Sequence, residues 1–107
     1  MSYNKLVRDN IPNIIREKGD EPITTILTDD EYIIELERKL LEECNEVIES
    51  SGASRINELA DVLEVLIAIA EFQGNNFDDI LSARNEKKLE RGAFNKKIYL
   101  KGVKKCK

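Results

Sequence analysis

One segment of the chain, from Leu59 to Phe72, is apolar almost all the way round and limits what the rest of the chain can fold into. It reads LADVLEVLIAIAEF, with polar residues at only three positions. A helix that is hydrophobic on nearly every side has to be covered by other protein. The sequence therefore predicts a central helix packed among other helices, and in a chain of 107 residues it favours an oligomer over a monomer.

Composition narrows the possible partners and fold classes. Charged residues make up 36% of the chain, aromatic residues only 6%, and tryptophan is absent, which favours helices packed through aliphatic side chains. The net charge of -4 argues against a nucleic-acid polymer as partner. Cys44 and Cys106 have no disulfide-scaffold or metal-binding spacing, which indicates a reducing, cytoplasmic setting. The longest apolar run, residues 65–70, is far shorter than the roughly 20 residues of a membrane span, so no membrane association is expected.

Breakers and capping residues predict a single all-α domain over residues 1–107. A short helix is expected within NIPNIIREKGD, with Pro12 at its start and Gly19 after its end. Thr28 opens a long helix, the Ser-Ser-Gly run at 50–52 ends it, and the central helix returns antiparallel as a hairpin. A further helix, FDDILSARNEKKLER, is stopped by Gly92. Two short strands, near residues 22–27 and 96–101, are expected to pair as a minor β element.

Four acidic residues lie on helix faces that border the predicted core. Glu43 is on the edge of the apolar stripe of the first long helix, and Glu46 lies slightly farther out. Glu58 and Asp61 lie on a face of the central helix that continues as Val65 and later apolar residues. Ionised carboxylates buried without a partner cost several kcal/mol, which a divalent cation can offset. Other acids of the hairpin point away from the apolar stripes and are expected to be solvated: Glu35, Glu42, Glu49, Glu64 and Glu71.

The chemistry open to such a cluster is limited by the absence of histidine from the whole chain. Zinc sites with histidine ligands, carboxylate–histidine di-iron sites and Ser-His or Cys-His nucleophiles are excluded. Carboxylate oxygens suit Mg²⁺, with Mn²⁺ as the other candidate, and such ions commonly work beside substrate phosphates. The pattern therefore indicates metal-assisted hydrolysis of a phosphoanhydride.

Basic residues continue the apolar stripe of the last helix. Arg84, Lys88 and Arg91 lie close to that stripe, with Asn85 beside them and Lys87 on the other flank. They are candidates for binding substrate phosphates. The alternative is that these long side chains extend over the edge of a core or pair with neighbouring acids.

The order EECNE, then ELADV, then ARNEKKLERGAF resembles the all-α nucleoside triphosphate pyrophosphohydrolase superfamily, which includes the MazG-like and phosphoribosyl-ATP pyrophosphohydrolase-like proteins. The opening YNKLVRDNIPNII and the closing RGAFNKKIYL resemble a small single-domain branch, so the likeness covers nearly the whole chain. It implies cleavage of a nucleoside triphosphate between its α and β phosphates, giving a monophosphate and pyrophosphate, as a house-cleaning activity. The resemblance also implies that four acids are catalytic magnesium ligands: Glu43, Glu46, Glu58 and Asp61. It implies that the substrate phosphates are bound by Asn85, by Lys87 or Lys88, and by Arg91.

The sequence allows alternatives for nucleotide recognition, for the role of the N-terminal charged residues and for the function itself. The eleven residues between the acidic pairs, 47–57, form a short connection for this superfamily and leave little room for a base-reading loop. Lys5, Arg8 and Asp9 could reach a phosphate or a neighbouring subunit, or form a local ion pair. The substrate could instead be phosphoribosyl-ATP of histidine biosynthesis. An alternative of another class is a non-catalytic helical interaction module whose acids only form a charged surface.

Overall fold

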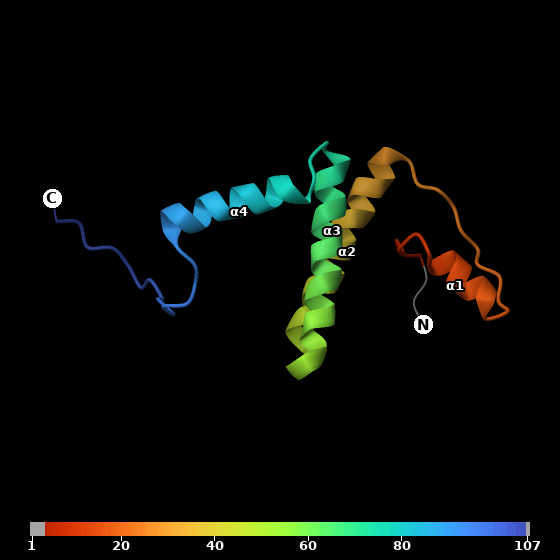
Figure 1. Cartoon of the computed structure of the whole chain (residues 1–107), viewed down its shortest axis with the longest axis horizontal. Coiled ribbons are helices and arrows are strands. Elements are labelled where there is room, and N and C mark those ends of the chain that lie inside the picture. The colour runs from red at the N-terminus through yellow and green to blue at the C-terminus, as the bar shows by residue number, and fades with distance from the viewer. Residues whose placement is uncertain (1–3, 107) are drawn as a thin grey trace. The chain divides into compact units, whose positions relative to one another are not determined.

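The computed structural model describes residues 4–106, and within that range its regular elements are all helical. They are α1 (Ile11–Glu17), α2 (Asp29–Glu49), the 3-10 turn η1 (Gly52–Ser54), α3 (Arg55–Phe72) and α4 (Phe77–Arg91), as Figure 1 shows. The prediction of an all-α chain is confirmed. The chain forms two compact units, Met1–Asn76 and Phe77–Lys107, and each is described by itself.

The helix boundaries in the first unit follow from local sequence signals. Pro12 occupies the first turn of α1, and Gly19 follows the helix with a φ of 91°, a conformation that glycine adopts without strain. Thr28 and Glu31 form a reciprocal capping box at the start of α2. The Thr28 backbone N–H donates to Glu31 Oε1 at 2.9 Å, and the Glu31 backbone N–H donates to Thr28 Oγ1 at 3.3 Å.

Helices α2 and α3 lie side by side as a hairpin joined through η1 (Figure 1). Their antiparallel direction is visible at the end far from the turn, where Tyr32 of early α2 meets Phe72 of late α3. The two ring centroids are 5.8 Å apart in an edge-to-face arrangement. The most buried apolar side chains of the described chain, Leu36, Val65 and Ala70, belong to these two helices. The predicted hairpin is therefore present, and it is the element that positions the acidic residues.

The expectation that α3 would be covered on nearly all sides is wrong for a single chain. Leu59, Leu63 and Leu66 are exposed to 47%, 41% and 37%. The physical reason is that α2 covers one side of α3 and, among the described residues of the first unit, is the only α-helix that packs against it. The hairpin thus presents a broad apolar surface.

The predicted two-stranded β element is also wrong. Residues 22–27 and 96–101 both lie in the described range 4–106, and neither forms a strand. Ile23 and Ile26 are fully exposed, and Ile98 and Tyr99 are largely exposed. β-branched residues form a strand only when a partner segment hydrogen-bonds to their backbone groups, and an isolated pair of strands has marginal stability at best.

Among the described residues, no helix is both long and apolar enough to cross a membrane.

Candidate metal centre

Three carboxylates meet where α2 and α3 face each other near the turn. Glu43 comes from α2, and Glu58 and Asp61 come from α3. One carboxylate oxygen from each lies within 4.8 Å of the other two, and all three residues are half-buried. Glu58 and Asp61 are three residues apart, so they share one side of their helix, and the short η1 connection sets Glu43 opposite them. The structure therefore brings together three of the four acids that the sequence analysis selected.

The fourth predicted acid, Glu46, lies at the edge of this group. Glu46 is exposed and is not one of the three residues, but its negative charge contributes to raising the pKa of Glu58. Helical periodicity predicts that Glu46 lies slightly farther from the core than Glu43, which agrees with its exposure. Four of the acids expected to be solvated are exposed: Glu42, Glu49, Glu64 and Glu71. The expectation is wrong for Glu35, which is half-buried and forms an ion pair with Arg38 on the same helix.

The ionised form of Glu58 is disfavoured by its surroundings in the cluster. Its pKa is raised above the ordinary value, first by desolvation and then by the negative charges of Glu46, Asp61 and Glu43. Loss of water and like charges both disfavour the ionised form. Within residues 4–106, no lysine or arginine forms an ion pair with Glu58. Glu58 is therefore the one carboxylate of the three without an ion-pair partner among the described residues.

Two cations approach the other two carboxylates. Lys39 Nζ lies 3.4 Å from Glu43 Oε1, one turn away on the same helix. Arg8 Nη2 donates to Asp61 Oδ1 at 2.8 Å from the segment that precedes α1. For Arg8 the sequence left three roles open. Lys39 was not predicted, although its spacing of four residues from Glu43 is the usual one for a helical ion pair.

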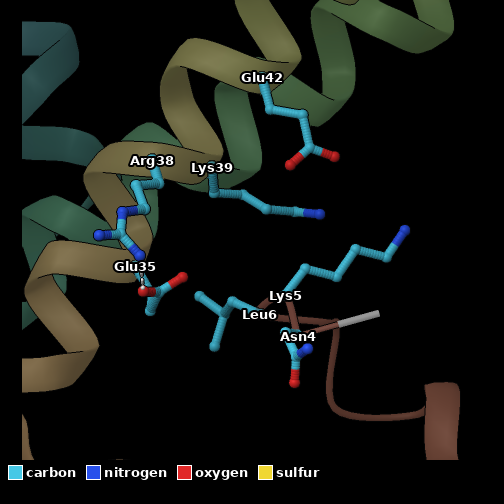
Figure 2. A pocket seen from close by; sticks show the side chains of 7 residues that line it. All are labelled: Asn4, Lys5, Leu6, Glu35, Arg38, Lys39 and Glu42. Carbon is cyan, nitrogen blue, oxygen red and sulfur yellow. Dashed lines mark hydrogen bonds and ion pairs between the residues drawn. The ribbon is translucent and has the colours of Figure 1, made fainter. Parts of the chain in front are cut away.

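A pocket lies between the N-terminal segment and α2. Its lining consists of Asn4, Lys5, Leu6, Glu35, Arg38, Lys39 and Glu42. Figure 2 shows the Lys5 and Lys39 side chains extending into the same space, with the Glu42 carboxylate beside them. Arg38 Nη1 pairs with Glu35 Oε2 at 2.7 Å, as the dashed line marks. Lys39 connects this pocket to the carboxylate cluster because it also contacts Glu43.

The donor set of the cluster fits a hard divalent cation. All its atoms are carboxylate oxygens, the ligands that Mg²⁺ and Mn²⁺ prefer. In octahedral coordination, oxygens at adjacent positions around Mg²⁺ are about 2.9 Å apart and those at opposite positions about 4.2 Å. The three oxygens lie within 4.8 Å of one another, so the side chains would have to move closer together to bind one ion.

The predicted phosphate-binding residues belong to the second unit. Asn85, Lys87, Lys88 and Arg91 lie on α4, and all four are exposed. Arg84 Nη1 donates to Asn85 Oδ1 at 3.1 Å. Because α4 and the hairpin belong to different units, their role in substrate binding stays a prediction, as does the choice between Lys87 and Lys88.

Comparisons with known proteins place few constraints on the function. No protein-family model and no solved structure matches the chain. An uncharacterized protein of Mycolicibacterium smegmatis is 49% identical over 43 residues, which is 40% of this chain and 44% of that protein. The likeness thus spans less than half of either protein.

Proposed function

We propose that this protein is a Mg²⁺-dependent nucleotide pyrophosphohydrolase. The observation that carries the proposal is the convergence of Glu43, Glu58 and Asp61 from two helices, within 4.8 Å and half-buried. Like charges this close raise the free energy of the protein unless a cation compensates them. The absence of histidine and the sequence likeness to the all-α pyrophosphohydrolases favour magnesium and phosphoanhydride chemistry over other uses of an acidic cluster.

The four acids are proposed to have two different roles, metal binding and activation of water. Glu43, Glu58 and Asp61 would hold Mg²⁺, or Mn²⁺ in its place. The bound cation would supply positive charge to the phosphates and lower the pKa of water. Glu46 is exposed beside the cluster, and we assign it to orient the attacking water and accept its proton. Water is added across the anhydride between the α and β phosphates, which yields a nucleoside monophosphate and pyrophosphate.

The substrate is proposed to be a nucleoside triphosphate that the cell removes as a house-cleaning reaction. On α4, Asn85, Lys87 or Lys88, and Arg91 would contact its phosphates. Phosphoribosyl-ATP is the second candidate substrate, because the reaction at the phosphates would be the same. A cytoplasmic location belongs to this proposal, since nucleotides of both kinds are found there.

We also propose a homo-oligomer, either a dimer or a tetramer, built on the apolar surface of α3. Only three apolar residues of the described chain are buried, whereas Leu59, Leu63 and Leu66 of α3 are partly exposed. Contiguous apolar surfaces of this kind usually mark an interface. Sedimentation should give a mass that is a multiple of the chain mass, and Leu63→Glu should lower it. A monomeric wild type would contradict this part of the proposal.

Pyrophosphate release from a panel of nucleotides with Mg²⁺ tests the activity. Glu43→Gln and Asp61→Asn should each abolish turnover, while Glu49→Gln, a matched change at an exposed acid of α2, should leave it intact. The panel includes phosphoribosyl-ATP, which separates the two candidate substrates. Absence of turnover by wild type, together with no effect of Mg²⁺ on its melting temperature, would instead support the non-catalytic module.

A further inference from the structure

The ion pair between Arg8 and Asp61 joins two segments that lie far apart in the sequence. The two residues are 53 positions apart, and the Nη2 to Oδ1 distance is 2.8 Å. Lys39 and Glu43 form an ordinary helical pair, which local spacing alone explains. No such local geometry accounts for Arg8, whose position depends on how the N-terminal segment lies against α3.

The Arg8 side chain is poorly suited to a purely structural role. It is 56% exposed, and the side chain of Asp61 is 41% exposed. Exposed ion pairs add little to stability, because water and salt screen them and ordering two long side chains costs entropy. The guanidinium can therefore leave Asp61 at small cost, and its five N–H donors suit phosphate oxygens as well as carboxylates.

We propose that Arg8 is an exchangeable counter-ion of the cluster, which pairs with Asp61 when no divalent cation is bound and turns to a phosphate oxygen of the substrate when the cation takes Asp61. This inference rests on the proposed function of the cluster. It gives the loop before α1 a direct role in binding the pyrophosphate part of the substrate. It also makes the binding of cation and substrate mutually supportive, because the cation releases the group that the substrate uses.

Removing the Arg8 side chain should change the two binding steps in opposite directions. The probes are Mn²⁺ alone, followed by electron paramagnetic resonance, and inorganic pyrophosphate at saturating Mn²⁺, followed by calorimetry. Arg8→Gln should bind Mn²⁺ about two- to fivefold more tightly, which is the size expected for losing an exposed competing ion pair. It should bind pyrophosphate about tenfold more weakly or worse, as expected for losing a charged hydrogen bond. Arg8→Lys, which keeps the charge, should recover part of the pyrophosphate affinity.

Arg38→Gln is the matched control. It removes the same charge from α2, the helix that carries Glu43, but its partner is Glu35, outside the three carboxylates. Both of its affinities should stay within twofold of wild type. A general electrostatic effect would change Arg38→Gln as much as Arg8→Gln and would overturn the inference.

The remaining outcomes separate this inference from the proposed function. If wild type binds Mn²⁺ but Arg8→Gln binds it equally or less tightly, or keeps its pyrophosphate affinity, the role of Arg8 is refuted and the metal site stands. Equal pyrophosphate affinities of Arg8→Gln and Arg8→Lys would also refute it, because the charge would then be irrelevant. If wild type binds no Mn²⁺, both proposals fail.

Discussion

Leu36 is the most deeply buried side chain of the described core, at 2% exposure, and it holds α2 against α3. We expect Leu36→Ala to destabilise the protein by about 3 kcal/mol. The change deletes three carbon atoms, and at about 0.8 kcal/mol for each buried methylene this gives about 2.4 kcal/mol. The cavity left behind adds to that figure, since Leu→Ala changes in protein cores cost about 2.7–5 kcal/mol in total.

Leu41→Ala is the matched control, because it is the same change on the same helix at a side chain that is 70% exposed. It should alter the free energy of unfolding by no more than about 0.5 kcal/mol. Urea denaturation followed by circular dichroism measures both variants. Protein concentration must be held constant, because assembly makes apparent stability depend on it. For a domain of this size, a loss of 3 kcal/mol lowers the melting temperature by about 12–24 °C.

Equal losses in the two variants would refute the reasoning, since burial within one chain would then not decide the energetics of α2. Leu41 would have to be buried by a second copy to the same degree as Leu36. A small loss at Leu36 would show that the hairpin does not depend on this contact. In either case, the geometry that brings Glu43 opposite Asp61 would have another origin.

Three further predictions concern single groups. Glu58→Gln should raise the melting temperature of the metal-free protein at neutral pH and abolish its stabilisation by Mg²⁺. Because the pKa of Glu58 is raised, the protein is most stable with Glu58 protonated and loses stability as pH rises through that pKa. A neutral amide at this position avoids that loss. The pKa of Glu31 is lowered mainly by the hydrogen bond from the Thr28 backbone N–H, so Glu31 should stabilise α2 above the ordinary glutamate pKa and lose this effect as pH falls through the lowered pKa. Glu31→Gln keeps the capping hydrogen bond and should flatten this part of an acid-denaturation profile. An unchanged profile would contradict the role of Glu31. Cys106 is exposed and Cys44 half-buried, so a thiol reagent should label Cys106 first, and labelling at equal rates would contradict the observed burial.

Helix positions were predictable because their signals are local. Pro12, Gly19 and the Thr28 capping box act within one turn of the helix end that each defines. The two expected strands failed for the opposite reason. Residues 22–27 are rich in β-branched residues, but a strand exists only where another segment accepts its hydrogen bonds, and local composition does not show whether such a partner is present.

The acidic cluster was predictable in part. Helical periodicity placed Glu43, Glu58 and Asp61 at core edges, and the short turn implied that the edges face each other. Periodicity placed Glu46 farther from the core than Glu43, but it could not show which carboxylate oxygens come within 4.8 Å of one another, because those distances depend on how the helices pack. Nor could it relate α4 to the cluster, since that depends on contacts between separate units.

By itself, the sequence determined the helices, their caps and which acids lie at an apolar edge, because each of these depends on neighbours within a few residues. The tertiary structure decided which carboxylates meet, how far α3 is covered by α2, and that Arg8 pairs with Asp61 across 53 residues. These features depend on distances between segments that the chain brings together only on folding. For that reason the charge balance around Glu58 is a property of the packed hairpin.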